Sequence, residues 1–125
     1  MAIKLFAYGT IRKSHAPSEI ADAVRCLRLL GKGTVRGKLY DLGDYPAAIF
    51  EPQASTLIEG NVYEVPNVTL LNKLDAYEEF DPRNPADSLF IRKRRKVRLI
   101  KNGEETLCWV YEYNGPISRE LETVA

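Results

Sequence analysis

Two short segments carry residue types that could do chemistry. Glu78 and Glu79 follow an apolar run that ends at Leu74, and Tyr8-Gly9-Thr10-Ile11 follows a strand-like run near the start. A carboxylate beside buried apolar groups is costly unless it has a partner or a task, such as carrying a proton. A glycine turn after a strand leaves backbone amides open, and such amides can hold a carboxylate or a developing oxyanion. Together the segments indicate a small enzyme with one acid/base carboxylate.

A helix must position the two glutamates. Asn67 is a typical cap for its first turn, and we expect the helix to run to about Tyr77. At its end Glu78 and Glu79 would point about 100° apart, so only one of them can face a pocket with Leu74. Both can instead be solvated surface residues, which is the common state of glutamate. The helical spacing of four apolar residues defines the expected buried stripe: Leu70, Leu71, Leu74 and Tyr77.

Strand-like runs make up most of the remaining chain. Asn102-Gly103 between the last two runs is typical of a β-hairpin, and a second helix is expected over residues 17–30, ended by Gly31. Because strands cluster without regular alternation with helices, the order predicts an α+β domain with a mixed, largely antiparallel, barrel-like sheet and flanking helices. The expected strands are residues 3–8, 34–40, 47–50, 57–65, 89–100 and 106–113.

The composition is that of one soluble domain. With 125 residues, the chain fits a single domain over 1–125, with a loose tail expected over about 114–125. Its 18 basic and 17 acidic residues give a net charge of +1, so no global field recruits nucleic acid or a membrane. The start leads directly into strand-like sequence and no apolar run is long enough to cross a bilayer. We therefore expect a cytoplasmic protein whose partner is a small molecule.

Cofactor and metal chemistry have no support in the sequence. Cys26 and Cys108 lie far apart without metal-ligand spacing, and we expect two buried, reduced thiols. His15 is the only histidine, so any Ser-His-Asp scheme would depend on it, and a solvated loop residue is the simpler interpretation. The glycine patterns of nucleotide sites are missing. The expectation is an enzyme with neither cofactor nor metal.

A basic run offers an alternative function. Residues 92–98 hold five arginines and lysines in succession and then Arg98, which resembles a nucleic-acid patch. On a strand these charges alternate between two faces. We therefore expect a solvated or paired strand and no nucleic-acid partner, with a nucleic-acid binder as the rival hypothesis. Four acids are available to offset the run: Asp75, Glu78, Glu79 and Asp81.

Four segments, in this order, resemble the motifs of the gamma-glutamylcyclotransferase-like superfamily. The match to its YG[ST]L, GxLYdlGxYPa, LDxxEG and WvYxY motifs spans nearly the whole chain. The resemblance implies a compact β-barrel with flanking helices that converts a gamma-glutamyl compound into 5-oxoproline and a free amine or amino acid. The matching segments are Tyr8-Gly9-Thr10-Ile11, 37–47, 74–79 and 109–113.

The same resemblance assigns roles to residues. Glu78 is implied to be the catalytic acid/base, and the backbone amides of Tyr8, Gly9, Thr10 and Ile11 are implied to hold the substrate. Glu79 stands where the family usually has glycine, and Phe90 stands where a tyrosine is common; both would alter the pocket wall. One carboxylate can take a proton from the substrate's α-amine and return it to the leaving amine. The alternative is a non-catalytic ligand-binding barrel that uses Glu78 only as a hydrogen-bond acceptor.

Overall fold

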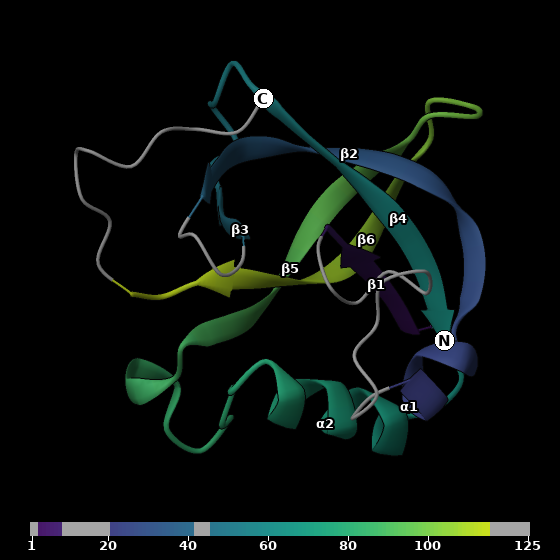
Figure 1. The fold of residues 1–125 in the computed structure, drawn as a ribbon. Helices are drawn as coiled ribbons and strands as arrows, with labels where there is room; N and C mark the ends of the chain where they lie inside the picture. The colour runs from purple at the N-terminus through teal and green to yellow at the C-terminus, as the bar shows by residue number, and fades with distance from the viewer. Residues whose placement is uncertain (1–2, 9–20, 42–45, 116–125) are drawn as a thin grey trace.

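The computed structural model describes residues 3–8, 21–41 and 46–115, shown as coloured ribbon in Figure 1. Six strands and two α-helices lie within these ranges, with a short 3₁₀ helix between α2 and β5. In chain order the elements are β1 (Ile3–Ala7), α1 (Ala21–Arg25), β2 (Arg28–Asp41), β3 (Pro46–Phe50), β4 (Leu57–Val65), α2 (Val68–Tyr77), the 3₁₀ helix (Pro85–Asp87), β5 (Phe90–Leu99) and β6 (Glu105–Tyr113).

The strands form a closed barrel. Their order is β3-β2-β4-β1-β6-β5, and β2 also pairs with β5, which closes five strands and leaves β3 attached outside the ring. Only β1 and β6 run parallel, meeting at Leu5 and Trp109. Both helices lie together at one end of the barrel, away from the turn between β5 and β6 (Figure 1). The predicted α+β class with a mixed, largely antiparallel barrel is therefore confirmed.

The first helix is shorter than its sequence spacing predicts. α1 ends at Arg25, and Arg28 already begins β2. Leu30 and Gly31, expected at the end of the helix, lie in a strand that pairs with β4 from Arg28 onward. The apolar spacing is helical in this region, but the ladder to β4 overrides it, and Gly31 takes a φ of 149° where the register shifts. Residues 17–20 lie outside the described ranges.

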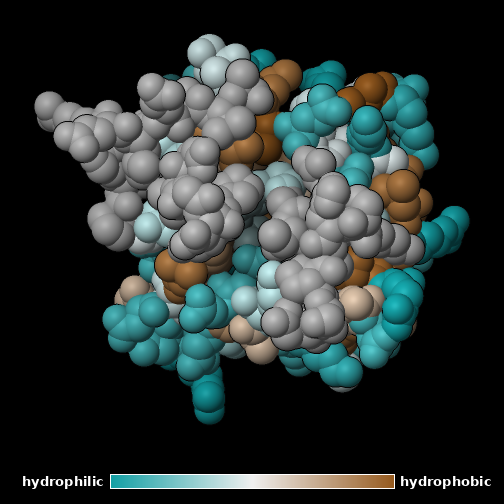
Figure 2. Space-filling view, in the orientation of Figure 1, coloured by the Kyte–Doolittle hydropathy of each residue, from teal (hydrophilic) through white to brown (hydrophobic). Residues whose placement is uncertain are grey.

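The later elements follow the sequence closely. β4 has the predicted bounds, and β5 and β6 form the predicted hairpin, in register from Phe90 opposite Tyr113 to Arg98 opposite Glu105. Gly103 in its turn has a φ of 72°, a conformation that glycine adopts without strain. The segment after α2 is almost wholly exposed, and hydrophilic side chains gather over it at the lower left of Figure 2.

Strand β6 is buried on both faces. Trp109, Tyr111 and Tyr113 pack with the cluster formed by the helices, as their alternation predicts. Cys108 and Val110 point to the other side, into a cluster inside the barrel. Because alternate side chains of β6 enter different clusters, Tyr111 lies on the side of the strand that faces α2. Cys108 is buried as expected, but Cys26 is exposed, because it lies in the turn after α1 between the buried Val24 and Leu27.

No helix in the described ranges has the length and apolar character that crossing a bilayer requires.

Candidate active site

Helix α2 begins and ends as its sequence predicts. The Asn67 side chain caps its first turn, since its Oδ1 accepts from the Leu70 amide at 2.8 Å. Leu70, Leu71 and Leu74 are buried on the stripe, while Tyr77 is half-buried. The Glu78 amide donates to the Leu74 carbonyl at 3.0 Å, so the last helical turn fixes the backbone of Glu78. The candidate acid/base thus lies on a rigid element.

The chain reverses directly after Glu78 in a left-handed helix end. The Glu79 amide donates to the Ala76 carbonyl at 3.2 Å, and the Phe80 amide donates to the Asp75 carbonyl at 2.9 Å. This pair of bonds is a Schellman motif, which places one residue in the left-handed region and favours glycine there. Glu79 occupies that position with a φ of 56°. Glu79, which stands where the family usually has glycine, therefore holds a strained backbone conformation.

Replacing this residue by glycine is expected to stabilise the protein. Glu79→Gly should raise the free energy of unfolding by about 1 kcal/mol, because a left-handed conformation costs an L side chain roughly that much. Urea denaturation measures the change. Glu79→Gln is the matched control, since it removes the charge but keeps the side chain and its strain. A stabilisation of the same size in both variants would point to charge and not to backbone conformation.

The electrostatics of Glu78 suit proton transfer at neutral pH. Its side chain is half-buried beside apolar groups. Burial raises the pKa of Glu78 to about 7, and the neighbouring charge of Glu79 adds to that rise. A carboxyl group with such a pKa is present in both protonation states near pH 7. It can therefore accept a proton in one step and donate it in the next.

Tyr8 enters the site through its side chain. Its hydroxyl donates to the Tyr111 carbonyl at 2.5 Å and accepts from the Ala48 amide at 3.3 Å. Burial, followed by the charge of Glu78, raises the pKa of Tyr8 above its ordinary value, so the phenol keeps its proton. The sequence indicates a substrate-holding role only for the backbone amide of this residue and none for its hydroxyl. Gly9, Thr10 and Ile11 lie outside the described residues, and their predicted role stays a prediction.

A buried ion pair lies beside the C-terminal end of α2. Asp75 is only 3% exposed, and its Oδ1 accepts from Arg92 Nε at 2.8 Å and from the Tyr111 hydroxyl at 2.7 Å. The guanidinium of Arg92 stacks over the Trp109 ring at 4.2 Å. Burial, together with the charges of Asp75 and Glu78, raises the pKa of Tyr111, which therefore remains a hydrogen-bond donor.

The sequence held one signal for this ion pair. Asp75 follows Leu74 and stands four residues after Leu71, so it falls on the edge of the buried stripe. A buried carboxylate requires a cation or several donors. Arg92 as its partner depends on how α2 packs against the β5–β6 hairpin, which no local pattern reveals.

A second buried acid connects three strands near Tyr8. Glu112 accepts from the Phe50 amide through Oε2 at 2.7 Å and from Lys93 Nζ through Oε1. Its charge is a further cause of the raised pKa of Tyr8. The first two bases of β5 are therefore neutralised, one by Asp75 and one by Glu112. Among the described residues, the other three acids expected to offset this strand form no salt bridge with it, and Asp81 pairs with Arg83.

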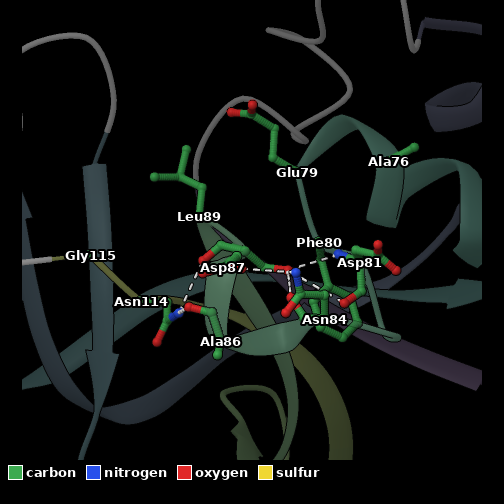
Figure 3. Close-up of a pocket in the computed structure, with 11 residues that line it drawn as sticks. Ala76, Glu79, Phe80, Asp81, Asn84, Ala86, Asp87, Leu89, Asn114 and Gly115 are labelled. Carbon is green, nitrogen blue, oxygen red and sulfur yellow. Dashed lines mark hydrogen bonds between the residues drawn. The ribbon is translucent and has the colours of Figure 1, made fainter.

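A pocket of about 630 Å³ opens beside the end of α2. Figure 3 shows Glu79 on its upper side and Asn114 on the opposite side, where the Asn114 side-chain amide donates to the carbonyl oxygens of Pro85, Ala86 and Ser88. The wall of the pocket includes Ala76 and Glu79 but not Glu78, and it carries three acids and no base. Its lining residues are Ala76, Glu79, Phe80, Asp81, Asn84, Ala86, Asp87, Ser88, Leu89, Asn114 and Gly115.

The arrangement suits proton transfer by a carboxyl group. Of the predicted site residues, Glu78 and Tyr8 are described, and the structure brings them together from the ends of α2 and β1. The pKa of Glu78 lies near neutrality, and its charge helps to raise the pKa values of two phenols, Tyr8 and Tyr111, which keep their protons. Across residues 3–8, 21–41 and 46–115, no three histidine, cysteine, aspartate or glutamate side chains converge as a metal site would require.

Comparison with known proteins agrees with this geometry. A sequence model of the family described as "Gamma-glutamyl cyclotransferase, AIG2-like" matches residues 5–124. No curated protein sequence matches the chain.

Three solved structures share the fold at low sequence identity. An AIG2-like protein from Mus musculus is 18% identical, with a TM-score of 0.76 over 98% of this chain and 86% of its own. YkqA from Bacillus subtilis is 23% identical, with a TM-score of 0.69 over 91% of this chain and 36% of its own, so the chain spans about a third of YkqA. A protein described as gamma-glutamyl cyclotransferase is 14% identical, with a TM-score of 0.65 over 98% of this chain and 70% of its own.

Proposed function

The chain belongs to the gamma-glutamyl cyclotransferase, AIG2-like family, and from that premise we propose that it releases 5-oxoproline and a free amine or amino acid from a gamma-glutamyl compound, with Glu78 as general acid/base. The observation that carries the proposal is the pKa of Glu78, which burial and Glu79 raise to about 7. A general acid/base works best when its pKa lies near the working pH.

The reaction needs one proton carrier. Ionised Glu78 takes a proton from the α-ammonium of the substrate, and the free amine attacks the γ-carbonyl carbon to close a five-membered ring. The tetrahedral intermediate then expels the amine of the γ-amide bond, whose nitrogen receives that proton from Glu78. The ring nitrogen gives its second proton to Glu78, which passes it to the released amine, so the lactam keeps one N–H and the amine leaves as an ammonium ion. Bond making and bond breaking balance without a cofactor or a metal.

Holding the substrate curled supplies much of the remaining catalysis. Attack within one molecule is fast when the reacting atoms are kept close together, because the entropy of bringing them together is already lost. We assign this task to the backbone amides of Tyr8, Gly9, Thr10 and Ile11, as the family resemblance implies. The protonated hydroxyl of Tyr8, close to Glu78, supports a polar, hydrogen-bonding wall at that point.

A substrate panel tests the proposal. Gamma-glutamyl amino acids, gamma-glutamyl amines and gamma-glutamyl conjugates of acylated metabolites are incubated with the protein, and release of 5-oxoproline is measured by mass spectrometry. Turnover of at least one class supports the proposal. Saturable binding of these compounds without any product would favour the non-catalytic ligand-binding barrel.

The rate should depend on pH through Glu78. Its carboxylate must be ionised to accept the ammonium proton, so kcat/KM should rise with pH, with a midpoint near the pKa of about 7. At higher pH the rate should fall again. The substrate amine, with a reference pKa of about 8, then loses its proton to solvent, and ionised Glu78 has no proton to pass to the leaving amine.

Glu79→Gln gives the internal control for this profile. The charge of Glu79 raises the pKa of Glu78, so its removal should move the acidic limb to lower pH. A profile that is flat from acid to neutral pH would argue against a carboxylate base.

A further inference from the structure

The seam that closes the barrel is short. β2 and β5 pair only at Gly33 with Leu99 and at Thr34 with Arg98, and from Gly37 onward β2 pairs with β3. Beyond the two paired positions the strands separate. A groove of about 680 Å³ opens there, between β5, the middle of β2, the start of β6 and the connection from β3 to β4. We call this the seam groove.

Positive charge gathers on the wall of the seam groove. Five bases face two acids, Glu51 and Glu105, which leaves a surplus of three positive charges in a protein whose total charge is +1. No salt bridge joins any of the five to another described residue. The bases are Arg36, Arg94, Arg95, Lys96 and Arg98.

The hydrogen bonding of these arginines is incomplete. Arg36 donates through Nη1 to the Ala54 carbonyl at 3.0 Å, and Arg95 donates through Nη1 to the Arg94 carbonyl at 2.9 Å. Arg95 Nε is shielded from solvent and has no hydrogen-bond partner within the described part of the chain. A buried donor without an acceptor is unfavourable, so an anion that supplied one would be stabilised here.

The groove also has an apolar wall. Leu57 is 56% exposed and Leu107 is 53% exposed, and both line the groove with Val35 and Pro52. An inorganic ion would leave this wall uncovered. A ligand with an apolar body and an anionic group would use both the apolar wall and the bases.

We propose that the seam groove binds a small organic phosphate with an apolar body. Guanidinium groups match the geometry of phosphate oxygens and bind them in pairs. All four bases of β5 that form no salt bridge with another described residue line the groove, because Asp75 and Glu112 neutralise the first two bases of that strand. A short concave cluster suits a small ligand better than the extended stripe that a nucleic-acid backbone needs.

This site is separate from Glu78. The groove uses β5 from Arg94 onward and the start of β6, whereas the candidate active site uses the start of β5 and the end of β6. In Figure 1 the turn between these strands lies at the end of the barrel away from α2. Binding at the groove can therefore be measured without a gamma-glutamyl substrate.

Calorimetric titration with 1-naphthyl phosphate at low ionic strength tests the proposal. The probe should bind at least about tenfold more tightly than either inorganic phosphate or 1-naphthol, since each of these lacks one half of the interaction. Arg95→Gln combined with Arg98→Gln should weaken binding at least about tenfold. Trp109 is the only tryptophan, and Arg94 lies 4.5 Å from its ring, so its fluorescence should report occupancy.

Two further variants keep the test decisive. Arg25→Gln combined with Arg28→Gln removes the same charge outside the groove and should leave binding of the probe unchanged. Lys96→Gln combined with Arg98→Gln alters exposed positions only, and it repeats the test if the Arg95 variant does not fold.

Three outcomes would overturn the proposal. The first is an equal loss of probe binding when Arg25→Gln is combined with Arg28→Gln. The second is inorganic phosphate binding as tightly as the probe. The third is duplex DNA binding more tightly through the same residues and displacing the probe, which would make the groove a nucleic-acid site.

Discussion

Glu78→Gln is expected to lower the release of 5-oxoproline by about 10²–10⁴-fold, the usual contribution of a general acid/base. Glutamine keeps the size and hydrogen bonding of the side chain but cannot carry a proton. The measurement is the initial rate on the best substrate of the panel. Glu79→Gln is the matched control, because it neutralises the adjacent carboxylate and should retain most of the activity at neutral pH.

Loss of activity in this variant should not come from unfolding. The folded-state pKa of Glu78 is raised from about 4.5 to about 7, so the folded protein holds more protons than the unfolded chain between these values. Stability contributed by this group therefore falls as pH rises through that window. Glutamine does not titrate, so the variant should be at least as stable as the parent above pH 7 by urea denaturation. Equal loss of activity in both variants, or full activity in the Glu78 variant, would sink the assignment.

Local patterns explain why helix α2 could be predicted from the sequence. The cap at Asn67, the leucine stripe and the break after Tyr77 are all set within one segment of chain, and the structure reproduces each. The hairpin around Gly103 is local in the same sense. β2 was predicted wrongly because its first residues have helical apolar spacing, while their structure depends on β4, about thirty residues further along.

The network around Glu78 required contacts that no single segment contains. Asp75, Arg92 and Tyr111 come from α2, β5 and β6, and they meet only once the barrel has closed. The resemblance implies the acid/base role for Glu78, which the structure places at the end of α2, but it gives no role to Asp75 or to the hydroxyl of Tyr8. The division of the basic strand has the same origin, since its two neutralised bases are those that form ion pairs with Asp75 and Glu112.

Asp75→Ala is expected to destabilise the protein by about 3–5 kcal/mol, the usual cost of removing one member of a buried ion pair. Arg92 would remain in a site where its side chain is 15% exposed, without a counter-charge, and the Tyr111 hydroxyl would lose its acceptor. Urea denaturation measures the loss. Asp75→Asn should cost less, because the amide oxygen still accepts a hydrogen bond from Tyr111 although the charge is gone.

Two comparisons separate the buried charge from a general effect of truncation. Asp22→Ala removes the acid of an exposed pair with Arg25 and should cost less than about 1 kcal/mol. Asp75→Leu combined with Arg92→Met replaces both buried partners by apolar side chains and should recover part of the stability lost in Asp75→Ala, because no unpaired charge is left inside. The free energy of unfolding of the double variant could instead be lower than that of Asp75→Ala. The attraction between the two charges would then exceed the cost of burying them, and the pair would be a net source of stability.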